Sequence, residues 1–166
     1  MILGMSTATY TFLHVLISLV GIGSGLIVMF GFLIGRQLSG MTAIFLITTV
    51  LTNVTGFGFP FDHLLPSHIV GIISLVVLAV AIPARYLFHL AGPWRWIYVV
   101  TAAVALYLNV FVLIVQLFEK VPALNALAPT QKEPPFLVVQ LVVMAIFVAL
   151  TIVAAKRFRI QPVRTV

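Results

Sequence analysis

The first 35 residues contain no Asp, Glu, Lys or Arg, and this stretch constrains the fold more than any other feature. Its part from Tyr10 to Gly35 can cross a bilayer, because a membrane-spanning helix needs ~20 predominantly apolar residues. A secretory signal peptide would carry Lys or Arg before a shorter apolar core of ~7–15 residues. We therefore interpret the stretch as a membrane helix.

The same apolar character continues through the rest of the chain. Of the 166 residues, 63% are hydrophobic and 7% are charged, and the mean hydropathy is +1.26. A soluble domain of this size cannot bury that much apolar surface, so the lipid bilayer must be part of the solvent. We expect an all-α, polytopic integral membrane helical bundle that forms a single transmembrane domain, residues 1–166. Its five transmembrane helices are expected at residues 10–35, 41–59, 68–90, 97–118 and 136–155.

Composition also excludes several classes of function. The chain has no cysteine, which rules out disulfides and thiolate metal ligands. Its only acids are Asp62, Glu119 and Glu133, and neither a Ser-His-Asp set nor a phosphate-binding loop is present. Hydrolysis and phosphoryl transfer are therefore disfavoured, and whether the protein is an enzyme stays open. The net charge of +6 comes from basic residues at helix ends, which indicates membrane orientation and no nucleic-acid partner.

The basic residues are divided unequally between the two sides of the expected membrane. Seven lie on one side and two on the other: Arg36, Arg85, Arg95, Lys156, Arg157, Arg159 and Arg164 against Lys120 and Lys132. Cytoplasmic segments carry the excess of Lys and Arg. We expect a multi-pass protein of the plasma membrane, here the bacterial inner membrane, with the N-terminus outside and the C-terminus cytoplasmic.

The first four expected spans form two similar hairpins. Each begins with a histidine near the outer surface, His14 or His68, crosses the membrane, turns at a short segment containing Arg and Gly, and returns. This pattern is compatible with a parallel hairpin repeat and equally with coincidence between two apolar hairpins. We expect these four spans to form the core, with the fifth helix packed outside or used for contacts between copies.

A polar segment, residues 56–68, separates the two hairpins. It contains the only Asp, two of the four histidines and two prolines. Asp62, His63 and His68 offer oxygen and nitrogen ligands suited to zinc or copper. The spacing of His63 and His68 across Pro66 matches no recognised ligand motif, so hydrogen bonding or a protonation switch remains an alternative.

His14 and His68 are also candidate cofactor ligands. Histidines at similar depth on two helices can supply both axial ligands of a b-type haem. Small residues share a face with each histidine and would leave room for a porphyrin: Ser18, Gly21 and Gly25 after His14, and Gly71 and Ala79 after His68. The sequence thus permits one haem b at the outer face, exchanging electrons with quinol or another redox partner. Structural hydrogen bonding of the histidines is the simpler interpretation, and both stay open.

Four polar side chains within the spans suggest a different function. Asn53, Asn109, Gln116 and Gln140 could line an intramembrane polar path, because polar residues inside a membrane are often functional. This favours a small transporter, although no ionisable side chain is expected near the midplane to couple protons or sodium. A third interpretation is a non-catalytic accessory or assembly subunit, with a membrane-protein partner or as a homo-oligomer. That interpretation requires no site.

The order of elements resembles that of small bacterial polytopic membrane proteins of uncharacterised function. These elements are the histidine-led span, the turn and the second histidine-led hairpin, with Gly56-Phe-Gly-Phe-Pro-Phe and Ser67-His-Ile between them. The layout of residues 10–118 also resembles the cytochrome b561-like four-helix bundles. That resemblance implies haem ligation by two histidine pairs, one in each leaflet. Only His14 and His68 match the outer pair and His89 has no partner, so the resemblance implies at most one haem.

Overall fold

The computed structural model describes residue 2 and residues 4–60 and 66–158. Within these residues the regular secondary structure is helical, without a named strand. Five helices are long and apolar enough to cross a membrane, and a short helix, α5 (Pro122–Leu127), lies between the last two. The five are α1 (Thr7–Leu33), α2 (Ser39–Gly56), α3 (Pro66–Tyr86), α4 (Trp94–Lys120) and α6 (Pro134–Arg157). The expected all-α polytopic bundle is confirmed.

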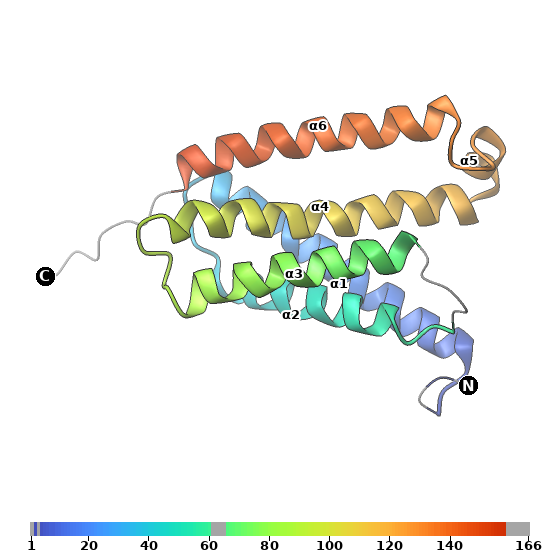
Figure 1. Ribbon diagram of the computed structural model, residues 1–166, viewed down its shortest axis with the longest axis horizontal. Helices are drawn as coiled ribbons and strands as arrows, with labels where there is room; N and C mark the ends of the chain where they lie inside the picture. The colour runs from blue at the N-terminus through green and yellow to red at the C-terminus, as the bar shows by residue number, and fades with distance from the viewer. Residues whose placement is uncertain (1, 3, 61–65, 159–166) are drawn as a thin grey trace, which may run out of the picture.

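Four of the long helices form the core (Figure 1). The helix α1 pairs with α2, and α3 pairs with α4; contacts of α2 with α3 and of α1 with α4 close the bundle. As a result, α1 and α3 occupy diagonally opposite positions. The helix α6 runs along the outside and packs on α4 and α1, as expected for the fifth span.

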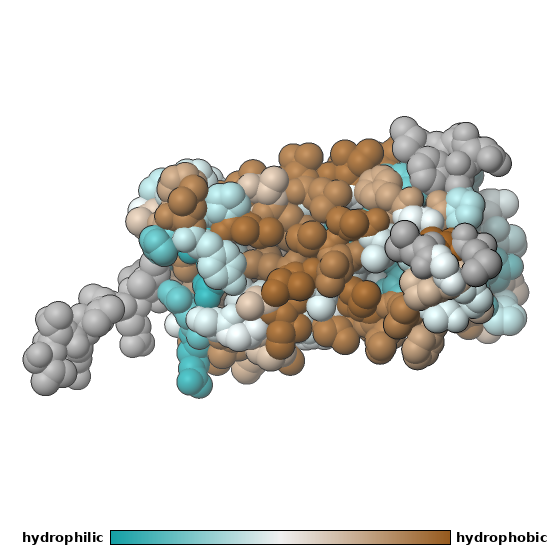
Figure 2. Space-filling view, turned by 90° about the horizontal axis from the view of Figure 1, so that it is seen from below, coloured by the Kyte–Doolittle hydropathy of each residue, from teal (hydrophilic) through white to brown (hydrophobic). Residues whose placement is uncertain are grey.

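The alternating direction of the helices gives the bundle two chemically different ends. We call one the histidine end, because it holds His14 and His68; it lies on the right of Figure 1, with the N-terminus and α5. We call the other the basic end, because it holds Arg36, Arg85, Arg95 and Arg157. Between the two ends, Figure 2 shows a broad apolar surface, as expected for a lipid-facing belt.

Local signals explain where the helices begin and end. The Ser6 hydroxyl accepts a hydrogen bond from the Thr9 N–H at 3.1 Å and caps α1. After α1 the chain turns through Gly35 at φ +70°, a left-handed conformation that glycine adopts without steric cost. The helix α3 ends at Tyr86 because the chain turns through left-handed residues at His89 and Leu90. This helix is four residues shorter than expected at that end, and His89 lies in a turn.

The inner packing depends on one close approach between helices. A Cβ atom added to Gly25 of α1 would lie 2.6 Å from Leu106 of α4 and 2.8 Å from Phe45 of α2.

By contrast, α6 buries one narrow stripe at coiled-coil-like spacing, formed by Phe136, Gln140, Phe147 and Ala154. The rest of α6 is left to face lipid.

Candidate functional site

His14 lies half-buried on α1 and is hydrogen-bonded to α2. Its Nδ1 lies 2.8 Å from the Thr55 hydroxyl oxygen, which in turn lies 2.7 Å from the Leu51 carbonyl oxygen. A threonine hydroxyl has one hydrogen, and here it is donated to the carbonyl. In the neutral ring Nδ1 must therefore carry the proton and donate it to Thr55. This assignment leaves the lone pair on Nε2.

Aromatic side chains fix the surroundings of His14. The Tyr10 hydroxyl donates a hydrogen bond to the Thr55 carbonyl oxygen at 2.8 Å. The ring of Phe59 contacts both Tyr10 and His14 edge to face, with centroids 5.0 and 5.2 Å away. The start of α1 is thus fastened to the end of α2 by two hydrogen bonds and two ring contacts.

His68 lies on the other side of the same end of α2. It is 5% exposed in the first turn of α3, and its ring stacks on Phe57 with centroids 5.5 Å apart and an angle of 29°. The two histidines therefore share one end of the bundle, but each packs on a different aromatic residue that follows α2.

The small-residue faces beside the histidines are filled by neighbouring helices. A Cβ atom on Gly21 would lie 3.2 Å from the Thr48 hydroxyl, and one on Gly71 would lie 3.5 Å from the Phe57 ring. The face of Gly25 is filled by Phe45 and Leu106. A porphyrin between α1 and α3 would need this volume, so haem binding there would require these side chains to move.

The expected metal set cannot be placed as a whole, because Asp62 and His63 lie outside the described residues. Among the residues that the structure describes, no three His, Asp or Glu side chains gather in a way that could hold a metal ion. The zinc or copper site stays a prediction that depends on residues 61–65.

Asn53 and Asn109 are both hydrogen-bonded to Thr49 in the interior of the bundle. The Asn53 side-chain amide donates to Ser74 Oγ on α3 at 3.0 Å and to the Thr49 carbonyl on its own helix at 2.8 Å. The Asn109 amide, on α4, donates to Thr49 Oγ1 at 3.4 Å. All four residues are buried. Such hydrogen bonds hold membrane helices together, so this polar chain joins α2, α3 and α4.

The two glutamines lie apart from this chain. Gln140 donates to the Phe111 carbonyl at 3.3 Å and joins α6 to α4, while its buried Oε1 has no partner among the described residues. Gln116 contacts Glu119 on its own helix at 3.5 Å. The structure thus brings together two of the four expected path residues, Asn53 and Asn109.

Arg85 is a polar residue whose setting the sequence did not reveal. It lies in the last turn of α3 and is only 9% exposed. Its Nη2 donates to Ser39 Oγ at 3.1 Å, and its guanidinium lies 5.7 Å from the Tyr86 ring centroid and 5.6 Å from that of Tyr98. The sequence signal was the adjacent Arg85-Tyr86 pair in a region without acidic residues.

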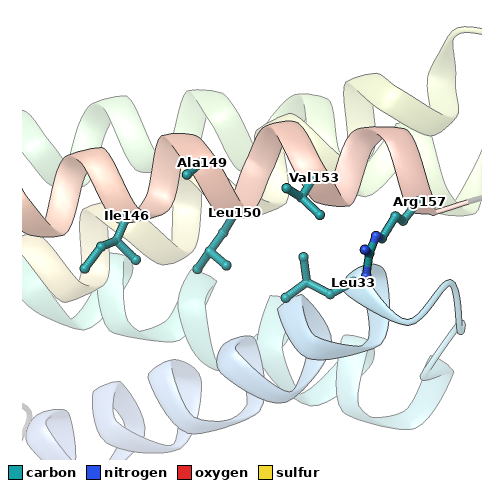
Figure 3. Close-up of a pocket in the computed structure, with 6 residues that line it drawn as sticks. All are labelled: Leu33, Ile146, Ala149, Leu150, Val153 and Arg157. Carbon is teal, nitrogen blue, oxygen red and sulfur yellow. The ribbon is translucent and has the colours of Figure 1, made fainter.

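Two apolar grooves mark the lipid-facing surface. The first, about 380 Å³, lies between α1 and α6, and the Arg157 side chain points towards Leu33 at its edge (Figure 3). The second, about 320 Å³, lies between α2 and α3. Neither is lined by a histidine or by an expected path residue, so neither is a site for the expected chemistry.

No protein-family model, curated protein or solved structure matches the chain. Its character as an integral membrane protein therefore rests on its five apolar helices.

Proposed function

We propose that the protein is a non-catalytic membrane subunit that contributes to a larger complex, with other membrane proteins or with its own copies. The observation that supports this proposal is that three of its intramembrane polar side chains join helices of the same chain. His14 is hydrogen-bonded to α2, Asn53 to α3 and Asn109 to α2. A transport path would need polar groups free to exchange partners with a solute, and these groups are already paired.

The surface of α6 agrees with this role. Leu137, Leu141 and Ile152 are each about half exposed, at 48%, 58% and 51%. Because α6 is held by one narrow stripe, most of its side chains are available to lipid or to another membrane protein.

Reconstitution from purified components tests the proposal. The tagged protein is extracted from its native membrane in mild detergent, and any co-purified protein is isolated separately and recombined with it. We expect a complex of fixed molar ratio, with a partner or with further copies, that forms again from its purified parts and has no visible absorption. A chain that stays monomeric at every concentration and recombines with nothing would contradict the proposal.

Ligation of one haem b, with electron transfer to quinol or another redox partner, is the second candidate. It is favoured by the placement of His14 and His68 at one end of diagonally opposed helices, and by the Nδ1–H hydrogen bond of His14. Haem-ligating histidines commonly donate their other N–H in this way. Binding would require Phe57 and Phe59 to leave the histidine rings.

An absorption spectrum separates the two candidates. Protein from haem-supplied cells would show sharp reduced bands if both histidines bind iron, and His14→Ala and His68→Ala would abolish them. His89→Ala is the matched control, since His89 lies at the basic end and should leave the bands unchanged. Colourless, folded protein that takes up no added haem would exclude the redox candidate.

A further inference from the structure

A buried arginine without an acidic partner lies at the basic end. Arg85 is 9% exposed, and its Nε is buried with no hydrogen-bond partner among the described residues. Its hydrogen bond to Ser39 and its contacts with the rings of Tyr86 and Tyr98 involve neutral groups only. A guanidinium withdrawn from water is costly unless a negative charge compensates it.

No Asp or Glu side chain among the described residues lies at this end. The three acids of the chain are Asp62, which precedes α3, and Glu119 and Glu133, which lie at or beyond the opposite end of α4. The carbonyl end of α3 stabilises Arg85 in part, because cations are favoured in the last turn of a helix. The unpartnered Nε remains, and it points to a ligand from outside the chain.

The first turn of α2 adds hydrogen-bond donors beside Arg85. The N-cap residue, Leu38, makes no side-chain hydrogen bond to the helix, so the first N–H groups of α2 lack a side-chain acceptor. Ser39, the first residue of α2, receives the hydrogen bond from Arg85 and is itself exposed. A helix N-terminus next to a guanidinium is suited to an oxyanion such as a phosphate group.

An apolar groove leads from this point along the membrane surface. It is the groove of about 320 Å³ that is lined by residues of α2 between 43 and 51 and by Ile82 and Tyr86 of α3. Ser39 and Ala43 are one turn apart on the same face of α2, so Ser39 lies in line with the groove. Tyr86 connects the two parts, because its ring lines the groove and also contacts Arg85.

We infer that the groove and the Arg85 site together bind an anionic phospholipid of the leaflet at the basic end. One acyl chain lies in the groove between α2 and α3. The phosphate is bound by the Arg85 guanidinium, the Ser39 hydroxyl and the first N–H groups of α2. A free phosphate ion would use only the charged part of this surface, whereas a phospholipid uses both. The inference does not depend on the proposed function.

Comparison of two lipids with identical acyl chains tests the site. The purified protein in uncharged detergent is titrated with phosphatidylglycerol or phosphatidylcholine, while native mass spectrometry measures retained lipid and thermal unfolding measures Tm. We expect phosphatidylglycerol to be retained preferentially and to raise Tm more. Arg85→Gln should weaken phosphatidylglycerol binding roughly tenfold, because it removes a charge-assisted hydrogen bond. Phosphatidylcholine binding should change little.

Two control pairs separate this site from general attraction. Arg157→Gln removes the same charge from the same end, but at the groove between α1 and α6, and should keep the wild-type preference (Figure 3). Ala43→Phe fills the groove without touching Arg85 and should lower phosphatidylglycerol retention. Its control is Ile44→Phe, at an exposed neighbour outside the groove, which should not.

Three outcomes would overturn the inference. The first is an equal effect of both lipids on the wild-type protein. The second is an equal loss in Arg85→Gln and Arg157→Gln, which would indicate unspecific attraction. The third is competition by inorganic phosphate as strong as that by phosphatidylglycerol, which would assign the site to a free anion. If Arg85→Gln does not fold, Ser39→Ala and Ala43→Phe replace it, and an unchanged lipid preference in both variants then takes the place of the second outcome.

Discussion

Amide and hydroxyl side chains link the helices of this bundle where charged pairs are nearly absent. Among the described residues, the one ion pair joins Lys120 and Glu119, which are neighbours in the sequence and exposed. In the interior, Asn53 instead shares its amide hydrogens between Ser74 and its own helix. An amide left unpaired in hydrocarbon would be costly, so such pairing is needed for the helices to associate.

Substitution of Asn53 should measure this contribution. Asn53→Ala removes the hydrogen bond to Ser74, and we expect the free energy of unfolding in mixed micelles to fall by about 1 kcal/mol. Gln116→Ala is the matched control, because the side-chain hydrogen bond of Gln116 goes to Glu119 on its own helix. Equal stability losses in both variants would contradict a specific role of the link between α2 and α3.

The loop before α6 contains a pH-dependent turn. Desolvation raises the pKa of Glu133. Hydrogen bonds lower this pKa by more, so that it lies below its ordinary value of 4.5. The donors are the Thr130 side chain and the backbone N–H groups of Glu133, Thr130 and Lys132. The ionised carboxylate therefore stabilises the turn fully above the ordinary pKa of Glu133. This stabilisation is lost as the pH falls through the lower pKa of the folded state.

Acidification should consequently loosen this turn. We expect the protection of the Thr130 and Lys132 amides from hydrogen exchange, corrected for the intrinsic rate, to decrease below the ordinary pKa of Glu133, because both amides donate to its carboxylate. In Glu133→Gln the protection should be lower and independent of pH in this range. Constant protection of the wild-type protein down to low pH would disprove the assignment.

At the scale of the elements, hydropathy predicts the spans well because the bilayer selects length and apolarity directly. Each expected end lies two to four residues from the observed one. The short helix α5 was missed, since its six residues lie in a proline-rich loop without an apolar run. The links between His14 and Thr55 and between Asn53 and Ser74 could not be predicted either. Periodicity gives the face on which a residue lies but not the helix that this face meets.

The contact of α1 with α2 and α4 depends on the absence of one side chain. Gly25→Ala should lower the free energy of unfolding by about 1–3 kcal/mol, because its Cβ would overlap Phe45 and Leu106. Gly23→Ala provides the control two residues away, since nothing lies within 4 Å of its added Cβ atom. That variant should be neutral or stabilising by up to roughly 1 kcal/mol. A comparable loss in both variants would show that helix flexibility matters here and close packing does not.

For the whole molecule, the unequal distribution of charge along the bundle axis predicts its orientation. Five basic residues at the basic end lie within the described chain, namely Arg36, Arg85, Arg95, Lys156 and Arg157, whereas the histidine end has Lys120 and Lys132. Positive charge is retained on the cytoplasmic side. The same orientation would place the Arg85 site in the cytoplasmic leaflet, where anionic lipids are available to it.

Single cysteines can test this orientation without background, because the natural chain contains none. We expect a membrane-impermeant maleimide to label Ala126→Cys on the exposed side of α5 in intact cells. Gln37→Cys, in the turn between α1 and α2, and Gln161→Cys, near the C-terminus, should react only after the cells are permeabilised. Because five spans place the termini on opposite sides, all three positions must agree. Labelling of Gln161→Cys from outside intact cells would reverse the orientation and would place the Arg85 site in the outer leaflet.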